Sequence, residues 1–434
     1  MAEADVASLP ALAYTYHPQS FAPLSIIEAA DGLCRMIWVI DSADLDAVAM
    51  LTILRRFGPV IDAAGRTIEE VAALLEEHSP DGVLSMHDSD LMWTARLAAA
   101  LGRPFHSLDA ATKLTDKYQQ RLALAAAGLA VPAFGTIPPQ AGGAAIERLA
   151  KDFPFPAVLK PRRGQASRDT FPVGSSDQLR TTMAELRARP GQAPEEYILE
   201  QFVPDPVEPL GGEGFAPFVS VESVVEGGRI AHAAISARTP FRWPFLETGY
   251  CTPTAIDPSL QAEILRVAGE AALALGVTQA CLHTEIKLTD DGPVVIEVNG
   301  RPGGGISEML ERASGFSILR TALSLAVGIP VGLDGPVSCS RVGYLLYAFP
   351  ESDLTVIDAV EGLSELRAVD GVDEIVLVRG PGQRIDWREG SEAHVFHLTG
   401  TTRDHQELRR LVSATTTLVR IDGHDEPIPE LEKG

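Results

Sequence analysis

Two glutamates twelve residues apart, Glu285 and Glu297, constrain the fold of this chain more than any other feature. They lie in two short alternating strand patterns separated by residues 290–292, Asp-Asp-Gly, which are typical of a tight hairpin turn. A hairpin centred near Asp291 places the two carboxylates opposite each other. Like charges facing each other across a strand pair are destabilising, by about 4 kcal/mol at about 4 Å for an effective dielectric constant of about 20. We therefore expect a cation between them.

The alternation of side chains along this hairpin gives it a polar face and an apolar face. The polar face carries His283, Glu285, Lys287, Glu297, Asn299 and Arg301. The apolar face carries Ile286, Leu288, Val294, Ile296 and Val298. The polar set offers oxygen ligands for a divalent cation together with positive charge for a polyphosphate. An ordinary half-exposed hairpin would alternate in the same way, but here the polar edge continues into the glycine-rich loop 302–305, which favours a ligand site.

The composition restricts the class of partner. The chain has 434 residues, 45% hydrophobic and 22% charged, which is typical of a globular protein with two or three domains. A net charge of −23 argues against nucleic acid and anionic membranes as partners. Residues 1–20 lack the pattern of a signal peptide, and the longest apolar stretch, 321–333, is too short to span a bilayer. The four cysteines have neither metal-ligand nor disulfide-scaffold spacing, so we expect a cytoplasmic location.

Strands alternate with helices in the first part of the chain. We predict strands at 35–41, 59–62 and 82–86, each followed by a helix, at 45–57, 67–78 and 90–101. This order predicts a small doubly wound, Rossmann-like domain with a parallel sheet. We assign residues 1–108 to this domain, with 1–29 irregular.

From residue 109 the pattern is mixed. We predict strands at 155–160, 197–203, 219–225, 341–349, 374–379 and 394–399. The predicted helices are at 114–127, 176–188, 260–275, 306–327 and 404–416. These elements predict a domain at 109–335, with a lid subdomain at 121–203, and a smaller C-terminal α+β domain at 336–434. The expected fold class is therefore α/β with α+β parts.

Two lysines precede the hairpin in positions that suggest bound phosphate. Lys117 follows Asp116 at the start of a predicted helix, where the helix dipole disfavours a cation unless an anion is near. Lys160 ends an apolar strand, and the loop after it, 161–167, combines Gly164 with small and basic residues that could fold over phosphates. Each pattern also has an ordinary explanation when it is taken alone. Lys117 could be a solvated surface lysine, and the loop 161–167 could be an exposed basic loop that binds nothing.

A third motif is Glu200-Gln-Phe-Val203, which closes a strand. The backbone of this edge could bind a purine, with Glu200 accepting a hydrogen bond from an exocyclic amine. An ordinary strand edge would have the same sequence, so this motif alone does not decide between the two.

In combination and in this order, the motifs resemble the ATP-grasp superfamily. The order is an Asp-Lys before a helix, a strand-terminal lysine before a loop, a Glu-x-x-Val strand end and a Glu…Glu-x-Asn-x-Arg hairpin. Further blocks at 245–250, 283–287 and 296–305 look like the L-amino acid ligase branch. The resemblance covers residues 30–335 and implies an ATP-grasp fold, which clamps ATP between two α+β subdomains.

The resemblance also implies a nucleotide and metal site. The residues implied to contact ATP are Lys117, Lys160, Ser167, Glu200, Gln201 and Val203. Magnesium, or manganese, is implied at Glu285, Glu297 and Asn299. The acid that binds the ribose stays open between Glu208, our assignment, and Glu213, because Phe218 stands where relatives carry an acid. The loop after Lys160 carries less glycine than is usual for a lid, so this chain departs from the family pattern there.

The implied reaction is ATP-dependent formation of an amide. A carboxylate is activated as an acyl phosphate, an amine displaces phosphate, and ADP is released, giving a dipeptide or an amino-acid conjugate. Arg301 and Lys160 are the implied catalytic residues. Substrate contacts are assigned to Glu222, Glu247, His283, Arg301 and Gly304, although structural roles for the first three are equally compatible with the sequence. The resemblance further implies a homodimer.

Other functions fit the same motifs. An ATP-grasp ligase that loads an amino acid onto a carrier protein or a specialised metabolite would need the same site. A non-catalytic nucleotide-binding module would keep the fold, but the intact set at Glu285, Glu297, Asn299 and Arg301 argues against it. A biotin-dependent carboxylase is disfavoured, because the lid loop lacks a tetraglycine run and the chain has no Met-Lys-Met acceptor site.

Overall fold

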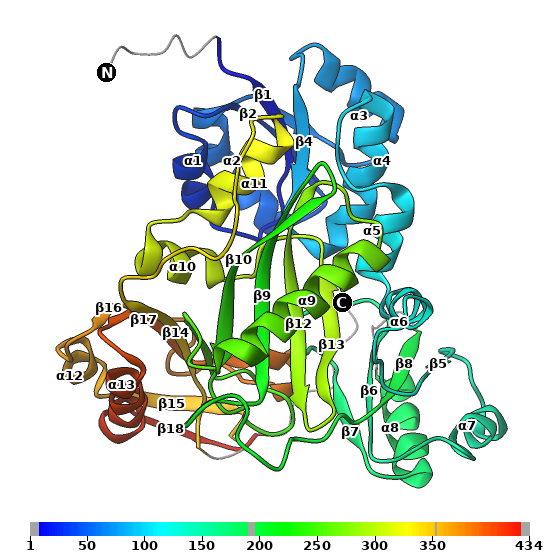
Figure 1. Ribbon diagram of the computed structural model, residues 1–434, viewed down its shortest axis with the longest axis vertical. Coiled ribbons are helices and arrows are strands. Elements are labelled where there is room, and N and C mark those ends of the chain that lie inside the picture. Colours follow the sequence, from blue (N-terminus) through cyan, green and yellow to red (C-terminus); the bar gives the residue numbers. More distant parts are fainter. Residues whose placement is uncertain (1–7, 190–195, 352–353, 427–434) are drawn as a thin grey trace.

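Three sheets organise the molecule. The computed structural model describes residues 8–189, 196–351 and 354–426. A four-stranded parallel sheet lies at one end, a large antiparallel sheet runs through the middle, and a second four-stranded sheet lies beside it (Figure 1). Within the described ranges, no helix is long and apolar enough to cross a membrane.

The N-terminal sheet is parallel and has the strand order β3-β2-β1-β4. Its strands are β1 (Ala11–Thr15), β2 (Arg35–Ile40), β3 (Val60–Asp62) and β4 (Gly82–Ser85). The helices around it are α1 (Pro23–Ala30), α2 (Leu45–Phe57), α3 (Ile68–Glu76) and α4 (Leu91–Leu101), with the short 3-10 helix η2 (Asp88–Asp90) after β4. Residues from α1, α2 and the distant α11 (Ile318–Ala326) pack on one face, and residues from α3 and α4 pack on the other. The predicted parallel-sheet domain is confirmed.

The expectation that residues 1–29 are irregular is wrong for β1 and α1. Strand β1, Ala-Leu-Ala-Tyr-Thr, pairs with both β2 and β4, and its first four residues are fully buried. A strand buried on both faces loses the alternation of polar and apolar residues that identifies most strands. Residues 1–7 lie outside the described ranges.

The central sheet has eight strands in the order β13-β12-β9-β10-β11-β14-β17-β16. The first five are β9 (Phe218–Glu226), β10 (Arg229–Arg238), β11 (Gly249–Thr252), β12 (Ala280–Thr289) and β13 (Gly292–Asn299). The same sheet continues through β14 (Val342–Ala348), β16 (Val372–Leu377) and β17 (Phe396–Thr402), so it crosses the domain boundary expected at residue 335. A separate pair, β15 (Val356–Glu361) and β18 (Arg420–His424), completes the C-terminal region.

Helices support this sheet from several sides. They are α9 (Pro258–Ala274), α10 (Ile306–Ser314), α11, α12 (Leu363–Arg367), α13 (His405–Leu418) and the 3-10 segment η3 (Trp387–Ala393). The helix predicted at 306–327 is two helices, because Gly315 ends α10 with a φ of 76° and the Ser317 side chain caps α11.

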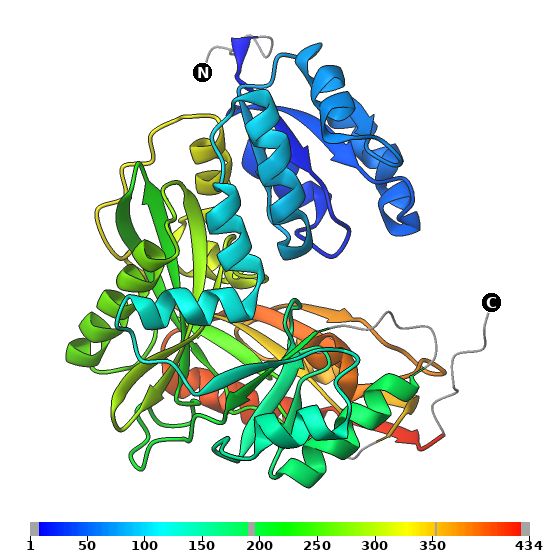
Figure 2. The ribbon, with the colours of Figure 1, turned by 90° about the vertical axis from the view of Figure 1, so that its right-hand side faces the viewer.

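The lid is the sheet β5-β8-β6-β7. It comprises β5 (Phe134–Ile137), β6 (Ala157–Pro161), β7 (Phe171–Val173) and β8 (Tyr197–Gln201), with a core that includes α7 (Gly143–Ala150) and α8 (Ser176–Ala188). Two helices, α5 (Leu108–Thr115) and α6 (Lys117–Ala126), connect the N-terminal sheet to the lid (Figure 2). The single helix predicted at 114–127 covers α6 but only the last two residues of α5. Asp116 divides them, because its side chain accepts the Tyr118 and Gln119 N–H groups and caps α6.

Candidate active site

The hairpin forms in the predicted register. Glu285 on β12 pairs with Glu297 on β13. The next pair is Ile286 with Val295, so Ile296 is an extra residue and makes a β-bulge. The bulge changes which side chains face the core. The prediction that Val294 and Ile296 face it is wrong, because Val295 takes the fully buried position and Ile296 lines a cavity.

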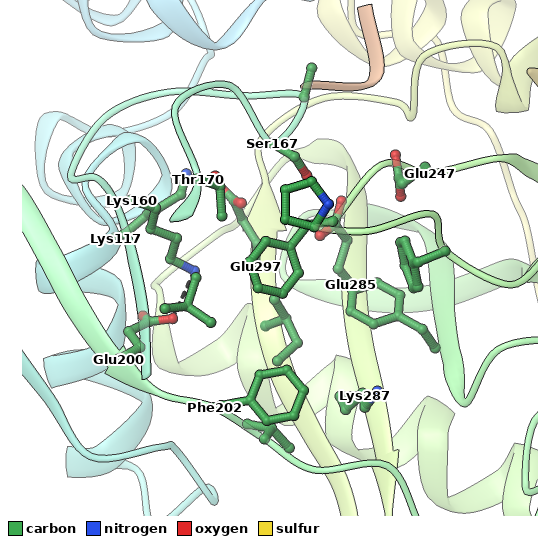
Figure 3. A pocket seen from close by; sticks show the side chains of 18 of the residues that line it. Lys117, Lys160, Ser167, Thr170, Glu200, Phe202, Glu247, Glu285, Lys287 and Glu297 are labelled. Atoms are coloured by element: carbon green, nitrogen blue, oxygen red, sulfur yellow. Dashed lines mark hydrogen bonds and ion pairs between the residues drawn. The ribbon is translucent and has the colours of Figure 1, made fainter. Parts of the chain in front are cut away.

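That cavity, of about 440 Å³, lies between the hairpin and the lid. Its charged lining includes Lys117, Lys160, Glu200, Glu285 and Glu297, which come from five separate elements (Figure 3). Gln201, Phe202 and Val203 line it at the end of β8, and Ser167 lines it from the lid loop. Most of the residues assigned to the nucleotide from the sequence are therefore brought together, with Glu208 the exception.

Helix α6 fixes Lys117 beside the hairpin. The Lys117 Nζ donates to Glu297 Oε1 at 2.6 Å and to the Gly164 carbonyl of the lid loop at 2.8 Å. Gln120 exchanges two hydrogen bonds with the backbone of Val298, at 2.8 and 3.0 Å. Strand β13 is the edge of the sheet, so these contacts satisfy backbone groups that no neighbouring strand pairs.

Glu200 is the buried centre of a second charged group. Its Oε2 lies 2.7 Å from Lys160 Nζ, and its Oε1 lies 2.8 Å from Arg121 Nε. Burial alone would raise the pKa of Glu200, but Arg121 and Lys160 outweigh burial and lower this pKa to about 2. The carboxylate is therefore ionised and holds both cations in place. Sequence analysis did not identify Arg121, whose signal is only that of a helical arginine.

Glu285 lies in a third charged group. Its Oε1 is 3.6 Å from His283 Nε2 and 3.9 Å from Arg238 Nη2. Burial opposes ionisation, but His283, Arg238 and Lys117 together lower the pKa of Glu285 to about 2. Glu285 therefore faces Glu297 as a carboxylate.

The residues present fit a divalent cation. Glu285 and Glu297 are paired carboxylates on neighbouring strands, and Asn299 follows on the same edge with its side chain 3.4 Å from the His283 carbonyl. Carboxylate and amide oxygens are the ligands that Mg²⁺ and Mn²⁺ prefer. The donor set of the hairpin thus suits the metal that the resemblance implies.

The residues assigned to substrate are distributed around this centre. Glu247 lines the cavity and accepts hydrogen bonds from Arg238 Nε at 2.8 Å and from the Tyr250 hydroxyl. Glu222 is fully buried, where it pairs with His283 and accepts the Gly303 N–H at 3.2 Å. Glu222 therefore holds His283 and the 302–305 loop in place from beneath the cavity.

Two further substrate assignments lie on the loop after β13. Gly304 is exposed in that loop. Arg301 lies outside the lining of the nucleotide cavity, and its Nε donates to Asp88 Oδ2 at 3.0 Å. Burial opposes the charge of its guanidinium, but Asp88, Glu297 and Glu285 raise the pKa of Arg301.

An acid that sequence analysis missed lines the cavity. Asp205 forms an ion pair with Lys287, and Lys287 pairs in register with Phe218 on β9. Asp205 thus brings a carboxylate close to Phe218, the position at which relatives carry an acid. Glu208 is exposed away from the cavity lining, and Glu213, also exposed, pairs with Arg409 at 3.2 Å. The position of Asp205 depends on the path of the loop between β8 and β9, which no sequence pattern indicates.

The lid loop is held by both neighbouring regions. Gln165 Nε2 lies 2.8 Å from His87 Nε2 of the N-terminal region. The Ala166 carbonyl accepts the Ser391 N–H at 3.0 Å, and the Asp169 N–H donates to the Arg388 carbonyl at 2.9 Å. The loop therefore closes one side of the cavity.

Comparisons with known proteins agree with this arrangement. A family model described as ATP-grasp domain matches residues 153–309. Carnosine synthase 1 of Homo sapiens is 29% identical over 266 residues, which are 57% of this chain and 31% of that protein. An alanine–anticapsin ligase of Bacillus amyloliquefaciens is 25% identical over 236 residues, which are 51% of this chain and 48% of that protein. The chain thus spans less than half the length of either relative.

The whole fold also has a solved counterpart. The structure of an L-amino acid ligase from Bacillus licheniformis matches with a TM-score of 0.73, covering 96% of this chain and 99% of that chain at 19% identity. At this identity the likeness shows the fold. The family match and the sequence relatives show that the protein carries an ATP-grasp domain and is related to proteins named as ligases.

Proposed function

We propose that the protein is an ATP-dependent carboxylate–amine ligase, which forms an amide through an acyl phosphate and releases ADP and phosphate. The observation that carries this proposal is the facing pair Glu285 and Glu297, with Lys117 on one of them and Lys160 across the same cavity. Paired carboxylates close to two lysines are the groups that hold a metal–polyphosphate complex.

The charged residues of the cavity and the lid loop have separate roles in this reaction. Lys117 and Lys160 add fixed positive charge beside the phosphates, and Arg301, which Asp88 holds in place, adds positive charge where negative charge develops. A magnesium ion at Glu285, Glu297 and Asn299 would offset the charge of the phosphates. The lid loop excludes water, which would otherwise hydrolyse the acyl phosphate.

The nucleotide assignments follow the lining of the cavity. We place the adenine against Gln201 and Val203, with Ser167 above the phosphates. For the ribose hydroxyls we propose Asp205 in place of Glu208, because Asp205 lines the cavity and Lys287 holds its carboxylate there.

The substrates proposed are an amino acid that supplies the carboxylate and a small amine, giving a dipeptide or amino-acid conjugate. Glu247 supports this class, because it places a carboxylate at the cavity wall, where the ammonium group of an amino acid could bind. The relatives support it too, since two of them are named carnosine synthase and alanine–anticapsin ligase. A homodimer in the cytoplasm remains the expectation for the assembly and its location.

A release assay tests the reaction directly. Purified protein is incubated with ATP, Mg²⁺ and pairs drawn from the twenty standard amino acids, β-alanine and simple amines, and phosphate release and product mass are measured. We expect ADP formation that depends on both partners and a product lighter by one water than their sum. ATP binding without ADP formation from any pair would instead identify a non-catalytic nucleotide-binding module.

A further inference from the structure

Ionisable side chains gather at the carboxyl ends of β1 and β4, outside the cavity lining. His17 follows β1, and His87, Asp88 and Asp90 follow β4. Strands β1 and β4 are neighbours in the order β3-β2-β1-β4. From β1 the chain continues to β2, on one side of β1, whereas β4 lies on the opposite side. In open parallel sheets, ligands bind outside the carboxyl ends of the strands at such a switch point.

Two contacts connect this group to residues beside the proposed reacting centre. Asp88 holds the guanidinium of Arg301 through Oδ2, and Arg301 lies two residues beyond the hairpin that carries Glu297. His87 contacts Gln165 of the lid loop at 2.8 Å. The group therefore contacts both the lid loop and Arg301.

The group contains two carboxylates and, among the residues that the structure describes, only Asp88 pairs with an arginine. Across the described residues, no lysine or arginine forms an ion pair with Asp90. Burial, together with Asp41 and Asp44, raises the pKa of Asp90 despite the opposing effect of His17. Burial also lowers the pKa of His87 to about 4, so its imidazole is neutral at pH 7.

Asp88 has an unused acceptor. Its Oδ1 is buried and has no hydrogen-bond partner within the described residues, while Oδ2 holds Arg301. A buried oxygen without a partner costs free energy unless a ligand or water supplies a donor. Within the described part of the chain, the group thus contains a buried acceptor without a donor and a carboxylate without a lysine or arginine partner.

A shared metal ion is the competing occupant. Ligand atoms of His17, His87 and Asp90 lie within 4.8 Å of one another. The two imidazole rings, however, stack in parallel, with centroids 3.5 Å apart and planes at 8°. Because the lone pairs of an imidazole lie in its ring plane, parallel rings do not direct them at one point, and both His87 nitrogens already have hydrogen-bond partners. The geometry favours an organic cation.

We infer that this group, formed by His17, His87, Asp88 and Asp90, is the site of the amine substrate, which it binds as an ammonium ion. The inference rests on the proposed ligase function. The bound ammonium loses a proton to water, and its nitrogen then forms a bond to the acyl carbon. The bond from that carbon to the phosphate oxygen breaks with its electron pair on phosphate, and a second proton leaves as the amide forms.

Hydroxylamine, used in place of the amine substrate, tests formation of the acyl phosphate separately from binding of the amine. It is uncharged at neutral pH and traps an acyl phosphate as a hydroxamate, so it needs no ammonium site. The carboxylate probe is the amino acid that gives the most hydroxamate, and the amine probes are glycinamide, L-lysine and 1,3-diaminopropane. Wild-type protein that forms no hydroxamate with any amino acid would refute the ligase proposal itself.

The variant that tests the site is Asp90→Asn. We expect the KM for the protonated amine to rise by about tenfold or more, the effect of losing one charge-assisted hydrogen bond, while hydroxamate formation stays within about twofold of wild type. Asp90→Glu should restore part of the amine affinity. The matched control is Glu69→Gln, an exposed carboxylate on α3 of the same region, which should change neither reaction.

Three results would overturn the inference. One is an unchanged amine KM in Asp90→Asn, and another is hydroxamate formation without amide from any of the three amines. The third is calorimetric binding of one Zn²⁺ per chain by wild type that His17→Ala abolishes, because it would assign the group to a metal.

Discussion

Each carboxylate in the cavity is matched by a cation from a different element. Glu297, near the end of β13, pairs with Lys117 at the start of α6. Glu200, near the end of β8, pairs with Lys160 near the end of β6. Such pairs contribute little net stability, but removing one partner leaves a buried charge that is strongly destabilising. The pairing therefore fixes where each charge lies.

Glu297 provides the most direct test of the metal site. Glu297→Gln keeps the size of the side chain and removes a charged ligand, so amino-acid-dependent ADP release should fall by about 100-fold or more. Thermal unfolding followed by circular dichroism should remain cooperative. Glu311→Gln, an exposed glutamate on α10, is the control and should behave as wild type. Unchanged turnover in Glu297→Gln would remove the metal assignment.

The proposed contact between Asp205 and the ribose can be tested by removing the Asp205 carboxylate, the ribose hydroxyls, or both. Asp205→Ala should raise the KM for ATP by about tenfold, as expected for a lost charge-assisted hydrogen bond. With 2′,3′-dideoxy-ATP the same substitution should have little effect, because a contact that is already missing cannot be lost twice. Glu208→Ala is the control. If Glu208→Ala shows the dependence on the ribose hydroxyls and Asp205→Ala does not, the ribose site belongs to Glu208.

At the scale of elements, the lid loop is closed by its neighbours and has little glycine of its own. Ala166, Ser167 and Asp169 all adopt positive φ, at 55°, 57° and 49°. Non-glycine residues pay about 1 to 3 kcal/mol each for such conformations, which persist only where surrounding contacts impose them. The contacts to Ser391 and Arg388 supply that constraint from the C-terminal region.

Gly390 makes this closure possible. A Cβ there would lie 2.0 Å from the Ala166 carbonyl oxygen, so Gly390→Ala should push the lid loop outward. Water would then reach the acyl phosphate, and the ratio of amide to ADP should fall by about half or more. Gly382→Ala is a matched control, because Gly382 also has a positive φ, of 82°, but a Cβ there meets nothing within 4 Å. An equal ratio in both variants would show that the loop does not protect the intermediate.

At the scale of the whole molecule, the cavity lies where separate regions of the chain meet. The central sheet supplies Glu285 and Glu297, the lid sheet supplies Lys160 and Glu200, and the connection between α5 and α6 supplies Lys117. Glu200 contributes to holding these regions together, because its two cations come from β6 and α6.

The stability of this arrangement should depend on pH through Glu200. Its pKa is lowered from 4.5 to about 2 in the folded protein, so its contribution is complete above about pH 4.5 and is lost as the pH falls toward 2. The shift corresponds to a contribution on the order of 3 kcal/mol. The difference in unfolding free energy between wild type and Glu200→Gln, measured by urea denaturation, should therefore shrink between pH 5 and about pH 3. A difference that stays constant over this range would contradict the role of Glu200.

Local sequence determined a large part of this protein. Alternation and the Asp-Asp-Gly turn predicted the hairpin and the pairing of Glu285 with Glu297, because both depend on neighbouring residues and on a strand period of two. The alternation of strands and helices predicted the parallel N-terminal sheet, because this pattern too is recorded in neighbouring residues of the chain. The order of the motifs was enough to indicate the ATP-grasp fold.

Tertiary structure alone decided the rest. The bulge at Ile296, the arrival of Asp205 beside Lys287, and the pairing of Arg301 with Asp88 each depend on segments far apart in the chain. No periodicity records such contacts, because they arise from how a loop or a neighbouring sheet packs once the elements have formed. The elements and the facing carboxylates were thus determined locally, whereas the groups that surround those carboxylates were selected by long-range packing.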